Sequence, residues 1–155
     1  MIDADSNCDV RACTPDDLAA LAAFCIEHAA YERMPLAVPP DAERLRRALF
    51  AAAPRLHAWL AWQGARPLGY ATASREFSTW NARDYLHMDC LYVRADARGL
   101  GIGAALLREV AATARRLGLA ELQWQTPDWN AGAIRFYRRH GAVASAKQRF
   151  VLALP

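Results

Sequence analysis

The chain has 155 residues, of which 54% are hydrophobic and 23% are charged, and its formal net charge is +3 at pH 7. This length predicts a single domain, residues 1–155, with a buried core. No apolar run approaches the roughly 18 residues of a membrane span, and so small a net charge does not indicate nucleic-acid binding. Because the acidic N-terminus also lacks the features of a signal peptide, we expect a cytoplasmic protein with no membrane or nucleic-acid partner.

The first part of the chain predicts one strand and two helices. Residues 9–13 are short and apolar, as in an opening strand. The Thr-Pro-Asp-Asp run at 14–17 is typical of a helix start, and an apolar stripe at helical spacing follows from 18 to 29. This helix must end near 31–32, because three prolines follow. A second helix is predicted over 41–52.

The middle of the chain predicts an antiparallel hairpin and a central strand. The runs 56–63 and 67–77 are joined by Gly-Ala-Arg, which is a hairpin signal. After a polar connection, residues 85–93 are apolar on both faces, as in a buried strand. Asp89 interrupts this strand. A carboxylate there is costly unless it is partnered or faces a cleft, so Asp89 has either a structural hydrogen bond or a function.

A glycine-rich turn follows this strand and precedes a helix predicted over 104–117. It reads Arg98-Gly99-Leu100-Gly101-Ile102-Gly103-Ala104. Glycines at a strand-to-helix turn leave backbone N–H groups uncovered where the helix dipole favours negative charge. The turn therefore predicts a phosphate-binding site; the alternative is an ordinary tight turn into a helix.

The surroundings of the turn narrow the choice of phosphate ligand. Gly99, Gly101 and Ala104 satisfy a loose dinucleotide-binding pattern, but that pattern normally opens a domain of repeated βαβ units. Only the last third of the chain follows here. There is no Gly-Lys-Ser/Thr of a P-loop either. The pattern that remains is Arg/Gln-x-x-Gly-x-Gly/Ala, which Arg98, Gly101 and Gly103 satisfy.

The last third of the chain predicts alternating strands and helices. Gly118 ends the helix at 104–117, and Gly141 ends a second, short helix. The predicted elements are a strand at 119–126, a loop at 127–130, a helix at 131–140, and one or two final strands at 143–154.

This order of elements, together with the glycine turn, resembles the GNAT acyl-CoA N-acyltransferases over the whole chain. The resemblance implies an α/β (α+β) fold, a mixed and mostly antiparallel central sheet flanked by about four helices. Within the superfamily the chain resembles the diamine (spermidine/spermine) acetyltransferase branch. Three further segments carry this likeness: Ala-Tyr-Glu-Arg-Met at 30–34, the isolated Trp80, and the run from Trp129 to Ala142.

The resemblance implies acetyl-CoA as co-substrate and assigns its contacts. The backbone of Gly99, Leu100, Gly101, Ile102, Gly103 and Ala104, with Arg98, would hold the pyrophosphate. The pantetheine arm would pair with the backbone of Leu91, Tyr92 and Val93 and with Asn130. Tyr137 would be the general acid for the departing thiolate, a role that suits a phenol because it keeps its proton at neutral pH.

The resemblance also implies an amine site. An aliphatic amine has a pKa near 10 and must lose a proton before it attacks; Asp89 matches the position of a glutamate base in this branch and, being shorter, would act through water. Tyr31, Glu32 and Trp80 match substrate-pocket positions, where a carboxylate and an indole face suit a second cationic group. The alternatives are a solvated glutamate at a helix end and a tryptophan that covers the core.

The chain departs from this branch in its acids. A polyamine site would be expected to carry several acidic residues, but the segment directly after Met34 has no acidic residue. Residues 146–155 have none either. This keeps a monoamine, an amino acid or a lysine analogue open as the acceptor. The expected activity is direct acetyl transfer to a small primary amine within a ternary complex. Acetylation of protein N-termini or lysines, and a non-catalytic acyl-CoA-binding regulator, are the alternatives.

The remaining expectations concern metals, thiols and oligomeric state. The histidines, and the cysteines Cys8, Cys13, Cys25 and Cys90, show no metal-ligand spacing, so we expect no metal. The cysteines lie in apolar segments, which favours buried, reduced thiols. The resemblance implies a homodimer, supported weakly by an apolar final strand at 150–154 whose edge would otherwise invite uncontrolled pairing.

Overall fold

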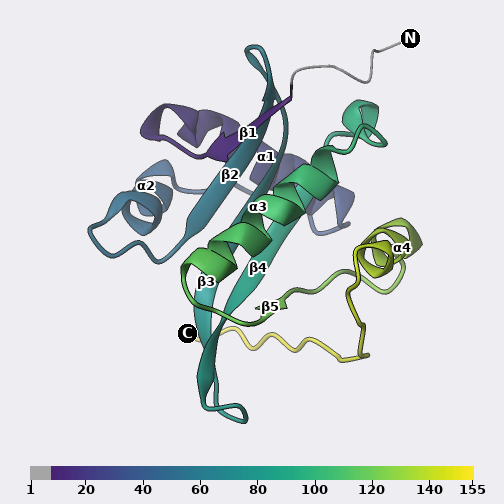
Figure 1. The fold of residues 1–155 in the computed structure, drawn as a ribbon. Helices are drawn as coiled ribbons and strands as arrows, with labels where there is room; N and C mark the ends of the chain where they lie inside the picture. Colours follow the sequence, from purple (N-terminus) through teal and green to yellow (C-terminus); the bar gives the residue numbers. More distant parts are fainter. Residues whose placement is uncertain (1–7) are drawn as a thin grey trace. The chain divides into compact units, whose positions relative to one another are not determined.

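The computed structural model describes residues 8–155, and the acidic segment 1–5 lies outside them. The chain, drawn in Figure 1, divides into two compact units, Met1–Gln125 and Thr126–Pro155. In the part of the chain that the structure describes, no helix is long and apolar enough to cross a membrane.

A sheet of five strands in sequence order forms the middle of the first unit. Successive strands β1 to β4 pair antiparallel, and β5 pairs parallel with β4. This confirms the predicted hairpin and the mostly antiparallel sheet. The strands are β1 (Asp9–Ala12), β2 (His57–Gln63), β3 (Arg66–Ser78), β4 (Arg83–Val93) and β5 (Leu122–Gln123).

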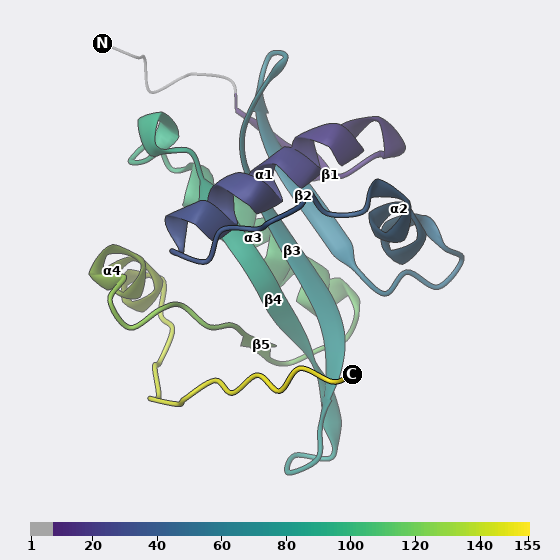
Figure 2. The ribbon, with the colours of Figure 1, turned by 180° about the vertical axis from the view of Figure 1, so that it is seen from behind.

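Helices cover both faces of this sheet. On one face lie α1 (Leu18–Tyr31), which follows a 3-10 turn at Pro15–Asp17, and α2 (Ala42–Phe50). On the opposite face lies α3 (Ile102–Arg116), which packs against β2, β3 and β4. Figures 1 and 2 show the two faces in turn. The first unit is therefore a three-layer α/β sandwich.

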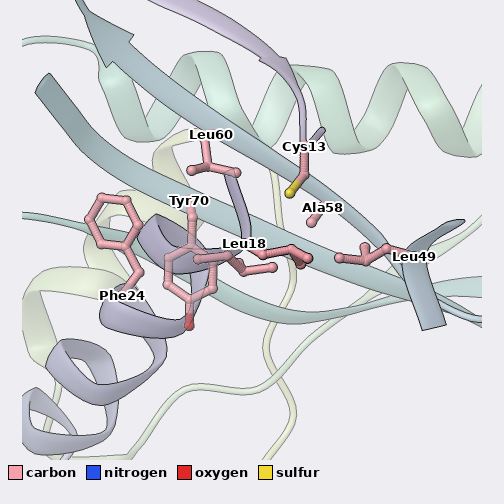
Figure 3. Packing of buried hydrophobic residues seen from close by; sticks show 8 residues of the cluster. Cys13, Leu18, Phe24, Leu49, Ala58, Leu60 and Tyr70 are labelled. Atoms are coloured by element: carbon pink, nitrogen blue, oxygen red, sulfur yellow. The ribbon is translucent and has the colours of Figure 1, made fainter. Parts of the chain in front are cut away.

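The core between α1, α2 and the sheet consists of apolar side chains that share nearly complete burial (Figure 3). Phe24 of α1 stacks on Tyr70 of β3 with ring centroids 5.4 Å apart. Because Tyr70 is only 1% exposed, its ring contributes to the core while its hydroxyl needs a buried partner. The cluster comprises Cys13, Leu18, Leu21, Phe24, Leu49, Ala58, Leu60 and Tyr70.

The start of α1 is fixed by a buried carboxylate. Asp17 accepts two hydrogen bonds from the Arg11 guanidinium, at 2.6 and 3.0 Å. It also accepts from the backbone N–H of Thr14 at 2.8 Å. The hydrogen bonds from Arg11, more than the other contacts, lower the pKa of Asp17 to about 2. This contact ties β1 to the first turn of the helix.

Replacing Asp17 with asparagine is expected to lower the free energy of unfolding by about 1–3 kcal/mol at pH 7, because hydrogen bonds to a charged group are lost. Since folding lowers the pKa of Asp17, this stabilisation is complete above its ordinary value of 3.8 and fades as the pH falls toward 2. Urea titrations from pH 7 to 2 should show the two proteins converging. Asp16→Asn, at an exposed neighbour, is the control; a pH-independent difference for Asp17→Asn would contradict the assignment.

The second unit contains α4 (Ala131–Arg139) and the segment that follows it. Gly141, with φ +87°, follows the helix as predicted. Residues 142–155 carry no regular secondary structure. Several large apolar side chains of this segment are at least 80% exposed: Val143, Phe150, Val151, Leu152 and Leu154.

Two predicted strand regions are corrected by the structure. The strand expected at 119–126 is only two residues long, because β5 pairs with β4 at Leu86 and His87 alone. The final strands expected at 143–154 do not form in the described chain. Apolar alternation shows that a segment suits a sheet, but a strand also needs a neighbour that receives its N–H and C=O groups.

Candidate active site

The glycine turn delivers the N-terminus of α3 to the surface. Gly99 and Gly101 adopt φ +80° and +79°, which other residues adopt only with strain. Gly101 is the N-cap, so α3 begins at Ile102, two residues earlier than predicted, and Gly103 and Ala104 lie in its first turn. A Cβ added at Gly99 or Gly101 would meet no atom within 4 Å. The turn is thus an open surface of backbone donors at the positive end of a 15-residue helix.

The strand before this turn has a partly unpaired edge. The N–H of Leu86 bonds to Glu121 at 3.0 Å, beside β5. β5 then ends, so residues 88–93 of β4 have no strand beside them on this side within the described chain. The N–H of Arg94 points to Leu68 at the start of β3; by alternation, the N–H and C=O groups of Leu91 and Val93 point the other way, to the open edge. A ligand with amide groups could pair there and continue to the glycine turn.

Asp89 lies where this edge opens. Cys90 pairs with Thr72 and Met88 with Ala73, so Asp89 is the extra residue of a β-bulge. Bulges re-aim side chains and occur often beside active sites. The Asp89 side chain is 67% exposed, so the cost of a buried carboxylate does not arise. It acts electrostatically on His28 of α1.

Arg98 holds the end of the open edge. Its Nε–H donates to the carbonyl of Val93 at 2.9 Å. Its guanidinium lies over the ring of Tyr31, 4.5 Å from the centroid, and 5.7 Å from that of Tyr92. These contacts bring together the end of α1, β4 and the glycine turn. A guanidinium at this junction suits a phosphate ligand.

The neighbouring Arg94 has a different role. Its guanidinium donates to both carboxylate oxygens of Glu27 at 2.6 and 3.0 Å and to the carbonyl of Pro67 at 2.9 Å. It also lies 4.9 Å from the centroid of the Phe24 ring. Although the sequence places Arg94 near the glycine turn, its charge is paired and joins α1 to the sheet.

The C-terminal end of α1 carries the predicted amine-site residues. Tyr31 is the last residue of the helix and Glu32 is its C-cap. Glu32 accepts a hydrogen bond from His28, with 3.1 Å between Oε1 and Nε2. The His28 ring stacks on Tyr92 at a centroid distance of 5.2 Å. The sequence reading gave His28 no role, although its i, i+4 spacing from Glu32 is a signal that could have indicated the pair.

Trp80 lies elsewhere in the first unit. It is 94% exposed at the turn between β3 and β4, just beyond the last pair, Ser78 with Arg83. Six residues of strand separate Arg83 from Asp89, which is about 20 Å at 3.3 Å per residue. The structure therefore groups Tyr31, Glu32, Asp89, Tyr92 and Arg98 near the open edge and places Trp80 at the far end of β4.

The second unit presents two predicted site residues on one helix. Asn130 caps α4, where its side-chain oxygen accepts from the N–H of Ala133 at 3.1 Å. This contact employs only the oxygen of the amide, so its NH₂ group is the part suited to a ligand. Tyr137 is seven residues further on, which is two turns and hence the same side of the helix. Its half-buried ring meets Phe136 edge-on at 5.2 Å.

Comparison with known proteins shows the family of the chain. The sequence model of the Acetyltransferase (GNAT) family matches residues 19–142. A thialysine N-epsilon-acetyltransferase from Caenorhabditis elegans is 34% identical over 84% of this chain and 80% of its own length. One from Bos taurus is 32% identical over 75% and 72%. An L-ornithine N5-acetyltransferase from Arabidopsis thaliana is 31% identical over 48% of this chain and 32% of its own.

Solved structures share the fold. An aminoglycoside acetyltransferase from an uncultured soil metagenomic sample superposes with a TM-score of 0.83, at 18% identity, over 99% of this chain and 100% of that one. The family match, the relatives and the fold confirm the expectation drawn from the glycine turn and the order of elements. The chain belongs to the GNAT acetyltransferase family and is an N-acetyltransferase.

Proposed function

We propose that this protein transfers the acetyl group of acetyl-CoA directly to a primary amine of a small molecule, within a ternary complex. The acceptor is a diamine, a polyamine or an amino acid with a side-chain amine. The observation that carries the proposal is the surface that runs from the open edge of β4 to the first turn of α3. The strand edge offers backbone groups that can pair with amides, and the helix turn offers N–H donors for phosphates.

The residues of the chain fit a pantetheine arm and a pyrophosphate. Leu91 and Val93 direct backbone groups outward, and the donors of the glycine turn lie beyond them. In this structure the Arg98 side chain donates a hydrogen bond to the Val93 carbonyl. It would turn toward the phosphates when they bind. Acetyl-CoA, when bound, supplies an activated thioester. The NH₂ group of Asn130 would donate to the same arm.

Two proton transfers complete the reaction. The acceptor amine must be neutral to attack, so its proton leaves first. Asp89, exposed on its bulge, would receive this proton through a water molecule. Tyr137 would donate a proton to the sulfur as the carbon–sulfur bond breaks, so that a neutral thiol departs. As the amide forms, its nitrogen gives up a second proton, which restores the Tyr137 hydroxyl, while the first proton passes from Asp89 to solvent.

Amino acids with a terminal amine are the preferred acceptors. The relatives named above act on the ε-amine of thialysine or on N5 of L-ornithine, and the few acids at the α1 end argue against long polyamines. Glu32 and Asp89 both act on His28 and so lie within electrostatic reach of one site. Two carboxylates there suit an acceptor with a second cationic group.

Replacing Asp89 with asparagine is expected to lower kcat by about 10²- to 10⁴-fold at pH 7, the usual contribution of a general base. The loss should shrink at pH 9–10, because more of the amine is then already neutral. Thiol release measured from pH 6 to 10 tests this. Because Asp89 is exposed, urea unfolding should be nearly unchanged; loss of stability without rescue at high pH would instead show a structural carboxylate.

A panel of acceptors tests the proposed function. Free-thiol release from acetyl-CoA is measured with thialysine, lysine, ornithine, spermidine, simple monoamines and peptides. We expect the amino acids and diamines to give the highest kcat/KM. Preference for peptides would favour a protein acetyltransferase, and acetyl-CoA binding without thiol release over the whole panel would favour a regulator.

We also propose a homodimer. Its support is the family resemblance and the apolar segment at 143–154, whose side chains are exposed in the single chain. Light scattering at micromolar concentration should give twice the chain mass of 17.2 kDa. A Phe150→Ser, Leu152→Ser double variant should shift the protein toward monomer, and a wild-type monomer would contradict the proposal.

A further inference from the structure

His28 stands between two groups of different character. Its side chain is only 12% exposed. Nδ1 lies 3.0 Å from the hydroxyl of Tyr70, and Nε2 lies 3.1 Å from the carboxylate of Glu32. The ring is held flat against Tyr92. Such a ring cannot turn without losing both hydrogen bonds, so its orientation is fixed.

The buried partners of His28 fix its tautomer. Tyr70 is buried, which raises its pKa, and its hydroxyl meets the thiols of Cys25 and Cys90. Burial also raises the pKa of both thiols, that of Cys90 to about 12. All three groups therefore keep their protons. The Glu32 carboxylate can only accept, so neutral His28 carries its hydrogen on Nε2, and Nδ1 accepts from the Tyr70 hydroxyl.

Glu32 needs this donor because of its place in the fold. It caps the C-terminal end of α1, where the helix dipole and the last carbonyls disfavour negative charge. Asp89 adds a second negative charge nearby. The Glu32 carboxylate is 34% exposed. Repelled by the helix end and by Asp89, it would turn to solvent unless a neighbouring group held it. A fixed N–H from a neutral ring holds the carboxylate while leaving its charge intact.

We propose that His28 is a positioning residue: it holds the carboxylate of Glu32 at the end of α1 to receive the second cationic group of the amine substrate. This inference rests on the proposed function. His28 touches neither the reacting amine nor the thioester; it selects acceptors with two cationic groups through Glu32.

The same geometry gives the selection a pH dependence. Burial, the largest influence, lowers the pKa of His28, while Glu32 and Asp89 oppose that shift. His28 is therefore neutral at pH 7, and the charge of Glu32 is available to the substrate. Below the pKa of His28 the imidazolium would neutralise Glu32 and weaken binding of a second ammonium group. The titratable groups that act on His28 are Glu32 at the end of α1, Tyr70 of β3, and Asp89 and Tyr92 of β4. Behind them, Cys25 and Cys90 meet Tyr70, and Arg98 lies over Tyr92.

Paired acceptors of equal length isolate this role. 1,5-Diaminopentane and pentylamine differ only in the second amino group. His28→Phe keeps a ring against Tyr92 but cannot donate to Glu32, and we expect the KM for the diamine to rise about 2- to 10-fold, the effect of one hydrogen bond. The kcat for both amines and the KM for pentylamine should stay within twofold. His28→Gln, which can donate, should restore part of the loss.

Tyr70→Phe tests the buried end of the chain of hydrogen bonds. Because Tyr70 is 1% exposed, it cannot touch an acceptor, yet its loss should raise the diamine KM in the same direction as His28→Phe. Tyr85→Phe, which removes a hydroxyl outside this network, should leave the diamine KM unchanged. The ¹⁵N chemical shifts of His28 should show the Nε2–H form in the wild type and a mixture of tautomers in Tyr70→Phe.

The ratio of the KM for the diamine to the KM for pentylamine, measured from pH 8.5 to 5.5, tests whether His28 positions Glu32. In the wild type the advantage of the diamine should fall as the pH drops through the pKa of His28, and in His28→Phe it should be flat. An unchanged ratio in His28→Phe and Tyr70→Phe would overturn the inference. If no amine releases thiol, the proposed function fails instead; a diamine-specific change in the His28 ¹⁵N shifts would then still support the positioning role, and its absence would overturn it.

Discussion

Tyr137→Phe is expected to lower kcat by about 10²- to 10⁴-fold, the range that general acid catalysis contributes. The variant loses one hydroxyl and keeps the ring that packs edge-on against Phe136. Stability and the dissociation constant for acetyl-CoA should therefore change little. Because the departing thiolate would have no positioned proton donor, the loss should appear equally in kcat and kcat/KM.

Two measurements separate this loss from an indirect effect. Tyr85→Phe removes a hydroxyl from a half-buried tyrosine outside the proposed site and should keep kcat within twofold. Isothermal titration with acetyl-CoA should give the same affinity for Tyr137→Phe as for the wild type. Near-normal kcat in Tyr137→Phe would mean that the thiolate leaves unprotonated or takes its proton from water, and the assigned role would be withdrawn.

Gly103→Val should weaken acetyl-CoA binding by more than about tenfold, since each hydrogen bond to a charged group contributes about 1.5–3 kcal/mol. Gly103 lies in the first turn of α3, where a branched side chain would cover the backbone donors. Valine is a better helix former than glycine, so the fold should be retained. Circular dichroism and urea unfolding check the fold, and isothermal titration gives the dissociation constant.

The two ends of α3 supply a matched control for the glycine turn. Gly101 at the N-cap and Gly118 just beyond the C-cap have φ of +79° and +71°, and a Cβ at either meets no atom within 4 Å. Alanine at either position should cause similar strain and a similar loss of stability. Only Gly101→Ala should also weaken acetyl-CoA binding. Equal affinities for both variants and for Gly103→Val would remove the phosphate-binding role of the turn.

The features that the sequence predicted well depend on local chemistry. The hairpin of β2 and β3 follows from alternation around a glycine turn, and the ends of α3 and α4 follow from the glycines at 118 and 141. The open turn at Gly99 and Gly101 likewise follows from residues adjacent in the chain. Such signals act within a few residues and need no knowledge of what packs against them.

The features that the sequence did not predict depend on distant partners. The bulge at Asp89 exists only in the register between β3 and β4, and it decides that this carboxylate is exposed. His28 gains its place from Tyr70, 42 residues away. The apolar segment at 143–154 has the pattern of a strand, but pattern alone cannot provide the neighbouring edge that a strand requires. Tertiary pairing decides each of these outcomes.

One measurement tests the central claim most directly. The protein is mixed with acetyl-CoA and thialysine, and the acetylated product, the released thiol and the mass of the acid-quenched protein are determined together. Direct transfer at the side-chain amine predicts one thiol per N-acetylated thialysine, acetylation at the ε-amine, and no acetyl group on the protein at any time. Thiol release without an acetylated amine, or an acetylated protein that forms and decays at the rate of turnover, would contradict it.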